Sequence, residues 1–288
     1  MAGNVKAQAL RGLLSKGEFV LAPGIYDGIS ARVADRMGFP ALYMTGYGAT
    51  ASALGLPDAG LATYSDMVGR AEMICSITNT PLIADADTGY GGLLNVRRTV
   101  QGYEAAGVAA IQIEDQEMPK KCGHTPGRRV VPAEEMVLKI RVAVEARRHD
   151  ETMIVARTDA RTAHGLDEAL RRARLYEEAG ADVIFVESPE SEAELERIGR
   201  EVEKPLLANM VEFGKTPRAE VARLKQWGFD MAIYPGLGFS VAAEAMRLAW
   251  THLKDKGTSI GVEVPQYRDM HELMGFPDVW DFEKRWAP

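Results

Sequence analysis

The sequence repeats one pattern about eight times. A short segment rich in Val, Ile and Leu is followed by a longer stretch with the hydrophobic period of an α-helix. Eight apolar strands, each followed by a helix, predict a closed parallel (β/α)8 barrel, the TIM-barrel fold. The predicted strands lie near Phe19–Ala22, Ala41–Thr45, Pro81–Asp85, Ala109–Ile113, Met153–Arg157, Asp182–Val186, Pro205–Asn209 and Met231–Tyr234. The predicted helices lie near Asp27–Met37, Tyr64–Thr78, Leu93–Ala106, Pro132–Arg148, Leu166–Ala179, Glu192–Val202, Pro217–Trp227 and Val241–Lys254.

An open doubly wound sheet is the alternative architecture for alternating strands and helices. It would place a glycine-rich phosphate loop after the first strand, whereas the segment Ala22–Asp27 reads Ala-Pro-Gly-Ile-Tyr-Asp. The turns from helix to strand also repeat, with glycines such as Gly107 and Gly180 where the helices end. The closed barrel is therefore the favoured prediction.

The chain has 288 residues and is 46% hydrophobic, which suits an α/β barrel of about 250 residues. The sequence shows no linker before about Lys256. We therefore expect a catalytic barrel over residues 1–256 and a C-terminal extension over residues 257–288, with a short helix at Tyr267–Met274. Aromatic residues on such an extension usually dock on the barrel or on a neighbouring subunit, and here they are Phe276, Trp280 and Trp286.

The charges exclude some classes of partner and compartment. The formal net charge of −7 comes from interspersed residues and argues against nucleic acid or a membrane surface as the main partner. No segment approaches the roughly 18 apolar residues of a membrane span, and Met1–Leu14 lacks the apolar core of a signal peptide. The two cysteines make a disulfide framework unexpected, which predicts a cytoplasmic protein.

The segment Lys120–His124, Lys-Lys-Cys-Gly-His, gathers a thiol, an imidazole and two ammonium groups in five residues. It follows an apolar run that ends in two carboxylates, so a metal-assisted site with a mobile proton donor is one interpretation. A solvated basic loop is the other. Cys122, in a polar context, is the candidate reactive thiol, whereas Cys75 lies in a helical pattern and is expected to be packed.

Active sites of such barrels lie at the C-terminal ends of the strands. There the sequence places Asp85 and Asp87 after one predicted strand and Glu114 after the next. Carboxylate oxygens suit a hard divalent ion such as Mg²⁺, which keeps several waters. Glu114 could hold a metal-bound water, and Asp58 could be a further carboxylate nearby. The alternative for Asp85 and Asp87 is a capped turn.

Arg157 follows another apolar strand, where an unpaired guanidinium would be unfavourable. A substrate carboxylate or oxyanion would satisfy it, and the alternative is a structural pair with Glu187 or Asp159. Glu187 and Asn209, which follow the next strands, could bind a second carboxylate or orient His124.

At these residues the chain resembles the isocitrate lyase and phosphoenolpyruvate mutase superfamily, from about Phe19 to Lys254. The resemblance implies a (β/α)8 barrel, usually a homotetramer in which terminal helices swap between subunits. It also implies Mg²⁺, with Mn²⁺ as an alternative, and a gating loop that carries residues 120–124. The ion would bind two aspartates, with two further acids near its waters, namely Asp85 and Asp87, then Asp58 and Glu114. The motifs that carry the resemblance are Asp85–Asp87, Glu114–Asp115, Lys120–His124, Val155–Asp159 and Asn209–Gly214.

The resemblance also bears on the reaction. Members that cleave a carbon–carbon bond carry the loop cysteine, so Cys122 implies a lyase, and Phe185 and Pro235 resemble the pocket of enzymes for methyl-branched acids. Methylisocitrate lyases usually carry threonine and arginine where this chain has Val211 and Ser240. We therefore expect a dicarboxylate such as 2,3-dimethylmalate. The alternatives are a tricarboxylate (2-methylisocitrate), oxaloacetate decarboxylation, or a non-catalytic carboxylate-binding protein.

The expected mechanism is a retro-aldol cleavage. Cys122 would protonate the carbanion, with Lys120 and His124 lowering the pKa of its thiol. Arg157 would stabilise developing negative charge. Tyr43 is the candidate base, although it could equally be a packed strand aromatic. The substrate-binding residues that we expect are Thr45, Gly46, Tyr47, Gly123, Arg157, Glu187, Asn209 and Pro235.

Overall fold

The computed structural model describes residues 3–123, 125 and 127–287 of the chain. Its eight strands are parallel and hydrogen-bonded in the order β6-β5-β4-β3-β2-β1-β8-β7. A parallel bridge between Ile184 and Leu206 joins the two ends of this order, so the sheet forms a nearly closed barrel and the predicted TIM-barrel fold is confirmed. The strands are β1 Val20–Ile25, β2 Leu42–Met44, β3 Leu82–Asp85, β4 Ala110–Glu114, β5 Met153–Thr158, β6 Val183–Val186, β7 Leu207–Asn209 and β8 Met231–Tyr234.

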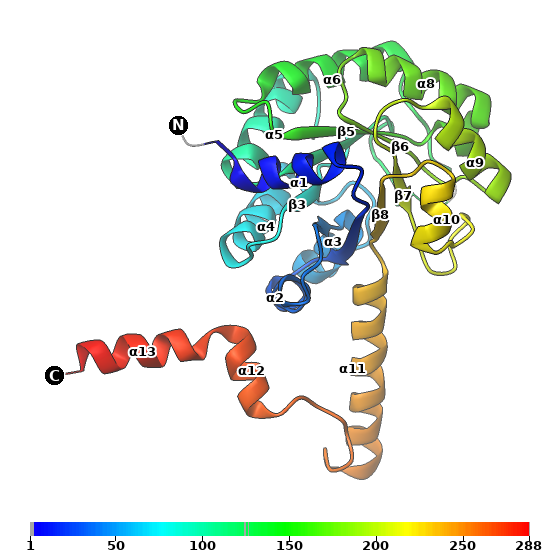
Figure 1. Cartoon of the computed structure of the whole chain (residues 1–288). Coiled ribbons are helices and arrows are strands. Elements are labelled where there is room, and N and C mark those ends of the chain that lie inside the picture. The colour runs from blue at the N-terminus through cyan, green and yellow to red at the C-terminus, as the bar shows by residue number, and fades with distance from the viewer. Residues whose placement is uncertain (1–2, 124, 126, 288) are drawn as a thin grey trace. The chain divides into compact units, whose positions relative to one another are not determined.

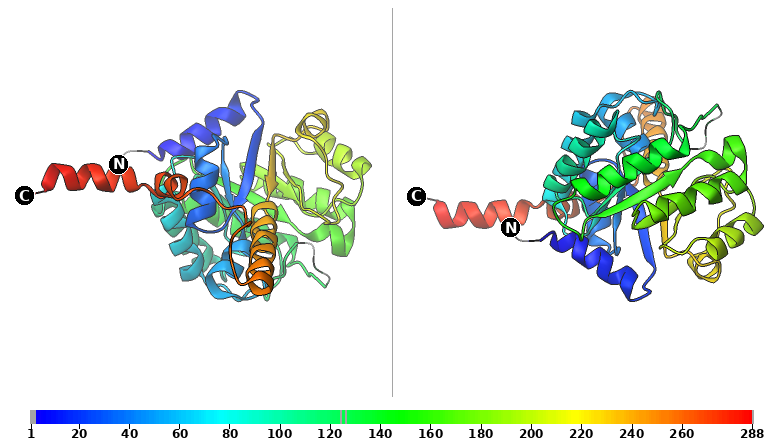
Figure 2. Two further views of the ribbon diagram at one scale, coloured as in Figure 1. Left: turned by 90° about the horizontal axis from the view of Figure 1, so that it is seen from below. Right: turned by 90° about the horizontal axis from the view of Figure 1, so that it is seen from above.

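Helices lie around the strands of this barrel, and α5, α6 and α8 pack against one another in sequence order (Figures 1 and 2). The helices are α1 Val5–Ser15, α2 Gly28–Arg36, α3 Gly46–Leu54, α4 Tyr64–Ile77, α5 Leu93–Ala105, α6 Ala133–Ala146, α7 Ala160–His164, α8 Leu166–Glu178, α9 Glu192–Glu201, α10 Val221–Gln226, α11 Leu237–Lys256, α12 Tyr267–Met274 and α13 Phe276–Trp286. Each predicted helix is present, α12 with the predicted ends and the others with shifted ends. Four helices, α1, α3, α7 and α13, were not predicted.

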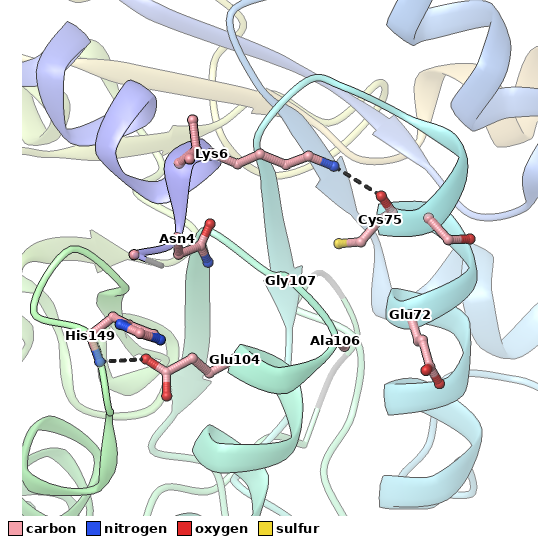
Figure 3. A pocket seen from close by; sticks show the side chains of 11 residues that line it. Asn4, Lys6, Glu72, Cys75, Glu104, Ala106, Gly107 and His149 are labelled. Carbon is pink, nitrogen blue, oxygen red and sulfur yellow. Dashed lines mark hydrogen bonds between the residues drawn. The ribbon is translucent and has the colours of Figure 1, made fainter. Parts of the chain in front are cut away.

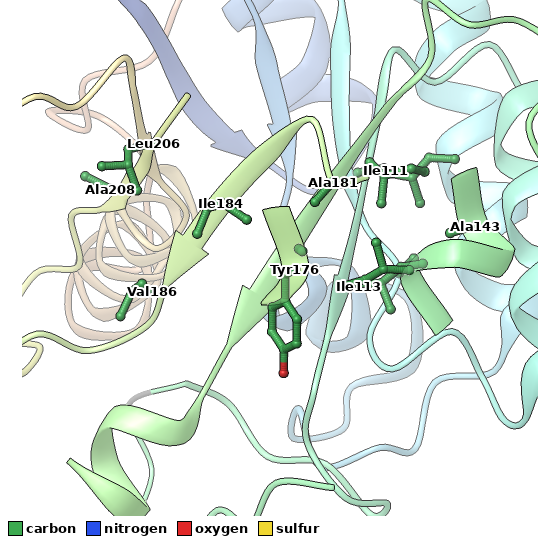
Figure 4. Packing of buried hydrophobic residues seen from close by; sticks show 14 of the residues in the cluster. Ile111, Ile113, Ala143, Tyr176, Ala181, Ile184, Val186, Leu206 and Ala208 are labelled. Carbon is green, nitrogen blue, oxygen red and sulfur yellow. The ribbon is translucent and has the colours of Figure 1, made fainter. Parts of the chain in front are cut away.

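Alternation along the strands divides the core into two layers, because successive side chains of a strand point to opposite faces. Ile111 and Ile113 of β4 belong to the cluster between strands and helices, together with Ile184 and Tyr176 (Figure 4). The other face belongs to a second cluster, which includes Phe185 and fills the barrel. The barrel is therefore packed with side chains, and only its ends are free to bind a ligand.

Helix α1 adds Ala7 and Leu10 to the interior cluster, and its first turn is tied to neighbouring elements. Lys6 Nζ donates to the carbonyls of Cys75 (2.9 Å) and Thr78 (2.6 Å) at the end of α4. Carbonyls at a helix end lack helical partners, and a cation there is favourable.

A cavity of about 470 Å³ lies beside this contact, lined by Lys6, Cys75, Glu104 and His149 among others (Figure 3). The Glu104 carboxylate accepts from the backbone amides of Arg148 (2.8 Å) and His149 (2.9 Å). Burial raises the pKa of the Cys75 thiol to about 11. Cys75 is therefore protonated at neutral pH and acts as a packed side chain.

The chain divides into two compact units, Met1–Phe239 and Ser240–Pro288. This division falls within α11, whereas the sequence analysis placed a boundary at 256/257, where α11 ends. That boundary stays a prediction. In the second unit the predicted aromatics are exposed, Phe276 at 42%, Trp280 at 44% and Trp286 at 73%. Among the residues that the structure describes, no helix is both long enough and apolar enough to cross a membrane.

Candidate active site

Three predicted acids meet at the C-terminal end of the barrel. Asp85 is the last residue of β3, Asp87 follows two residues later, and Glu114 is the last residue of β4. All three are buried. The register of the neighbouring strands pairs Glu114 with Arg157 of β5, so the guanidinium lies at the same level of the barrel. The strand ends therefore bring together acids that the sequence separates.

Lys120 enters this cluster from the loop after β4. Its ammonium nitrogen lies 2.5 Å from Oδ1 of Asp58 and 2.5 Å from Oδ1 of Asp87, and the side chain is 3% exposed. Burial alone would lower the pKa of Lys120, but the carboxylates of Asp87 and Glu114 raise it well above its ordinary value. Lys120 is therefore a fixed cation among the acids.

The acids are a chemically suitable set of ligands for a divalent ion. Burial and, to a lesser extent, the charge of Asp85 raise the pKa of Asp87 to about 6, although Lys120 opposes the shift. Asp87 also adopts a left-handed φ of +49°, a strained conformation that is usually retained for function. Within the described ranges no group of three or more His, Cys, Asp and Glu side chains is arranged so that it could hold a metal ion by itself. Two carboxylates completed by waters fit Mg²⁺.

Gly46 allows Asp85 to reach this position. A Cβ atom built on Gly46 would overlap Oδ2 of Asp85 and lie 3.2 Å from its Cγ. Gly46 is also the first residue of α3, and the N-cap residue, Thr45, makes no side-chain capping bond. The amides of Gly46 and Tyr47 therefore lie in the first turn of a helix, where backbone N–H groups and the helix dipole favour an anion.

Arg157 is held by three acids. It donates two hydrogen bonds of 2.9 Å to Asp159, and it lies 3.2 Å from Glu114 and 3.5 Å from Glu187. Burial opposes its charge, but Asp159 and Glu114 raise the pKa of Arg157 well above its ordinary value. The structural pair with Asp159, given above as the alternative, is thus present. Asn209 donates to the Glu187 carboxylate (3.0 Å), so these two residues also lie together.

The loop that carries Cys122 is hydrogen-bonded to segments around the acids. The Cys122 amide donates to the Asp58 carbonyl (3.2 Å), and the Gly123 carbonyl accepts from Ser188 Oγ (2.9 Å). A Cβ atom on Gly123 would lie 2.6 Å from Nη2 of Arg157. Close approach to Arg157 is therefore a physical reason for this glycine. His124 lies outside the described residues.

Tyr43 is a packed strand aromatic with a hydrogen bond. Its hydroxyl donates to Gln112 (3.1 Å), and the Gln112 amide donates weakly to Asp85 Oδ1 (3.4 Å). Burial, followed by the negative charge of Asp85, raises the pKa of Tyr43 well above its ordinary value. The side chain is therefore a neutral donor at physiological pH. Pro235 follows β8, and its backbone packs closely against Gly24 of β1.

The sequence analysis missed four polar residues around the site. Gln112, Gln116, Arg128 and Ser188 are each buried and hydrogen-bonded to site residues or to the loop. Gln112 could have been noticed, because it is a polar residue in the middle of an apolar strand. Gln116, Arg128 and Ser188 lie in segments without periodicity, where the sequence contains no corresponding signal.

Residues 10–254 match the sequence family described as phosphoenolpyruvate phosphomutase. The chain belongs to this family. Among its relatives, the 2,3-dimethylmalate lyase of Eubacterium barkeri is 50% identical over 98% of this chain and 98% of the relative. The 2-methylisocitrate lyase of Aeropyrum pernix is 45% identical over 96% of this chain and 88% of the relative.

Solved structures of the family show the same fold. Oxaloacetate acetylhydrolase bound to 3,3-difluorooxalacetate superimposes with a TM-score of 0.93 at 38% identity, covering 99% of this chain and 98% of that one. A phosphonopyruvate hydrolase structure with a TM-score of 0.89 and 29% identity, covering 98% of this chain and 99% of that one, contains oxalate and Mg²⁺. Magnesium dependence is typical of this family. The comparisons confirm the predicted superfamily and the predicted class of carbon–carbon lyase.

Proposed function

We propose that this member of the family cleaves a methyl-branched 2-hydroxy dicarboxylate of the 2,3-dimethylmalate type into pyruvate and propionate, and that it requires Mg²⁺. The position of Cys122 is the observation that supports this proposal. Its amide bonds to the Asp58 carbonyl, while its neighbours Lys120 and Gly123 pack on the buried acids and on Arg157. The backbone that carries the thiol is thereby held beside the groups that would bind an acid substrate.

Asp85 and Asp87 would hold the magnesium ion, with Asp58 and Glu114 close to its waters. When bound, the ion supplies positive charge for the hydroxyl and carboxylate oxygens at one end of the substrate. Mn²⁺ also accepts oxygen ligands and is the expected substitute. The pKa of Asp87, raised to about 6 by burial and neighbouring acids, supports a cation at this place, since positive charge would relieve the repulsion.

The two carboxylates of the substrate have separate binding groups in this proposal. The carboxylate beside the hydroxyl rests on the first-turn amides of α3, at Thr45, Gly46 and Tyr47. The other carboxylate lies near Arg157, with Gly123, Glu187 and Asn209 around it. The methyl groups would face Pro235 and Phe185. The Phe185 ring centroid lies 5.2 Å from the guanidinium carbon of Arg157, which places an apolar surface beside the cation.

The reaction breaks the bond between C2 and C3. A base removes the proton of the C2 hydroxyl, the C2–O electrons form the ketone of pyruvate, and the C2–C3 electron pair remains on C3. Cys122 then donates its proton to C3, which gives propionate. Arg157 stabilises negative charge that develops on the second carboxylate. A thiol suits this donation because its ordinary pKa of about 8.5 keeps it protonated near neutrality. The roles of Lys120 and His124 in tuning that pKa stay predictions.

Glu114 is a better candidate for the base than Tyr43. The Tyr43 hydroxyl already donates to Gln112, and its raised pKa keeps it protonated. Burial raises the pKa of Glu114 well above its ordinary value, although Arg157 opposes the shift. The Arg157 guanidinium lies 3.2 Å from Glu114 and favours the ionised carboxylate, which can accept a proton. We therefore assign proton removal to Glu114 in this proposal.

Two other substrates are the second candidates, and one relative or solved structure favours each of them. A tricarboxylate fits the 2-methylisocitrate lyase relative, and oxaloacetate fits the acetylhydrolase structure. The test is to incubate the Mg²⁺-loaded enzyme with 2,3-dimethylmalate, 2-methylisocitrate and oxaloacetate separately and to identify the products. Pyruvate with propionate supports the proposal. Pyruvate with succinate, pyruvate with carbon dioxide, or oxalate with acetate would assign the other reactions, and binding without turnover would assign a carboxylate-binding protein.

We also propose that the enzyme is a cytoplasmic homotetramer whose C-terminal extension contacts, and swaps onto, neighbouring subunits. The exposed aromatics of the second unit support this, because large apolar side chains in water usually mark an interface. Light scattering coupled to gel filtration should give four times the chain mass. A truncation after Gly257 should give a smaller particle, and a full-length monomer would contradict the proposal.

A further inference from the structure

The side chain of Gln116 uses every hydrogen-bonding group it has. Its Nε2 donates to Glu114 Oε1 (2.9 Å) and to the Lys121 carbonyl (2.8 Å), and its Oε1 accepts from the Lys121 amide (3.0 Å). The residue is 1% exposed. A primary amide has two N–H donors and one carbonyl oxygen, so no other residue type of this length could make the same three bonds.

These bonds join the end of β4 to the peptide before the reactive cysteine. Lys121 directly precedes Cys122, and Gln116 holds both the N–H and the C=O of Lys121. On the other side, the Cys122 amide donates to the Asp58 carbonyl (3.2 Å). The Cys122 backbone is therefore fixed between two segments, and only one of these links is made by a side chain.

The same amide also orients Glu114. One oxygen of this carboxylate accepts from Gln116, and the other lies 3.2 Å from Nη1 of Arg157. Rotation of the Glu114 carboxylate would break one of these contacts. A buried amide left without an acceptor is unfavourable, so the orientation of Glu114 and the position of the Lys121 backbone are tied to each other through Gln116.

We propose that Gln116 is a positioning residue, which holds the Cys122 backbone in register with the Glu114 carboxylate so that the proton donor and the base act on one substrate. Only the expected change in kcat rests on the proposed function. Gln116 itself touches neither substrate nor metal in this arrangement. Its loss should therefore lower turnover through Cys122, while substrate affinity changes little.

The test uses two variants of the full-length, Mg²⁺-loaded enzyme. Gln116→Met keeps the length and removes all three hydrogen bonds, and Gln116→Glu keeps the shape but loses both donors. Gln226→Met, at an exposed glutamine of α10, is the matched control. We would measure kcat and KM with 2,3-dimethylmalate, and the rate at which iodoacetamide alkylates Cys122, followed by peptide mass spectrometry. Cys75 gives little background because its pKa is raised to about 11.

Both Gln116 variants should lose about tenfold or more in kcat with KM within about threefold, as expected when buried hydrogen bonds are removed. Alkylation of Cys122 should become at least about fivefold faster, because its backbone is released, and Gln226→Met should match the wild type. Wild-type kcat and alkylation in Gln116→Met would overturn the proposal.

Two further outcomes also bear on the role of Gln116. Loss of cooperative melting in both variants would show that Gln116 acts in folding of the barrel, which also overturns the proposal. If the wild type cleaves none of the tested acids, the proposed function fails, and the alkylation rates alone still decide the role of Gln116.

Discussion

The ammonium nitrogen of Lys120 lies 2.5 Å from a carboxylate oxygen of Asp87. This ion pair ties the loop with the reactive thiol to an acid that follows β3, although nothing in the local sequence links the two segments. Because both groups are buried, removing either charge would leave the other buried without a partner, which is strongly destabilising. The charge on the acids and the position of the loop that carries Lys120 should therefore influence each other.

Replacing the loop thiol should remove chemistry and leave metal binding intact. Cys122→Ser should reduce cleavage by at least about a hundredfold, the lower range for a positioned general acid, because a serine hydroxyl is a much weaker acid. Isothermal titration should give an unchanged Mg²⁺ affinity. Cys75→Ala, at the other cysteine, is the control and should retain activity. Full turnover in Cys122→Ser would remove the thiol from the mechanism.

Magnesium affinity should depend on pH through Asp87. The pKa of this carboxyl is raised from 3.8 to about 6, chiefly by burial, so the proton competes with the metal below about pH 6. Affinity measured by titration calorimetry should be constant above about pH 7 and fall by up to about tenfold per unit below pH 6, the limit for one competing proton. Equal affinities at pH 5 and pH 7 would contradict this assignment.

A substitution tests whether the Asp87 carboxylate is needed for metal-dependent turnover. Asp87→Ala should abolish metal-dependent turnover, whereas Asp66→Ala, at the exposed N-terminus of α4, should leave Mg²⁺ affinity unchanged. Turnover by the wild type in excess chelator would show that the reaction needs no metal.

Gly46→Ala should weaken Mg²⁺ binding and activity together. The new Cβ would overlap the Asp85 carboxylate, which would have to turn away from the site. Gly69→Ala is the matched control, because this helical glycine of α4 is exposed and its Cβ would meet nothing within 4 Å. It should retain activity and stabilise the protein by about 0.5–1 kcal/mol. Wild-type metal affinity in Gly46→Ala would refute the close approach.

Glu104→Ala should destabilise the protein without changing kcat. The Glu104 carboxylate satisfies two backbone amides and the Thr152 hydroxyl at the end of the barrel opposite the site. Leaving these donors unpaired should lower the free energy of unfolding by roughly 2–4 kcal/mol, measured by urea denaturation. The exposed Glu178→Ala should change it by less than about 0.5 kcal/mol. Equal stabilities of the two variants would contradict the role of this buried carboxylate.

The helices and strands could be predicted wherever hydrophobic periodicity was strong. Helix α3 was missed because Gly46–Leu54 is rich in glycine and alanine and has no clear polar face. Helix α1 was also not predicted, although its buried residues Ala7 and Leu10 have helical spacing. The first segment thus carries a weak helical signal, whereas the second carries a clear one.

The candidate site was predicted in part. Asp85, Asp87, Glu114 and Arg157 could be placed at one end of the barrel, since the ends of parallel strands meet there whatever the details of packing. Whether Tyr43 can act as the base could not be predicted from the ends of the strands. Whether a strand tyrosine ionises depends on burial and on its partner, here Gln112, and neither can be read from the strand pattern.

The sequence by itself determined the kinds of elements, their order and the residues at the strand ends, because these follow from local periodicity and from the geometry of any parallel barrel. Only the tertiary structure decided that Lys120 reaches both Asp58 and Asp87, and that Gln116 holds Lys121 against Glu114. The loop after β4 has no repeating pattern, so its path is set by burial of its charges and amides among partners from distant segments. Such partners become neighbours only when the barrel has closed.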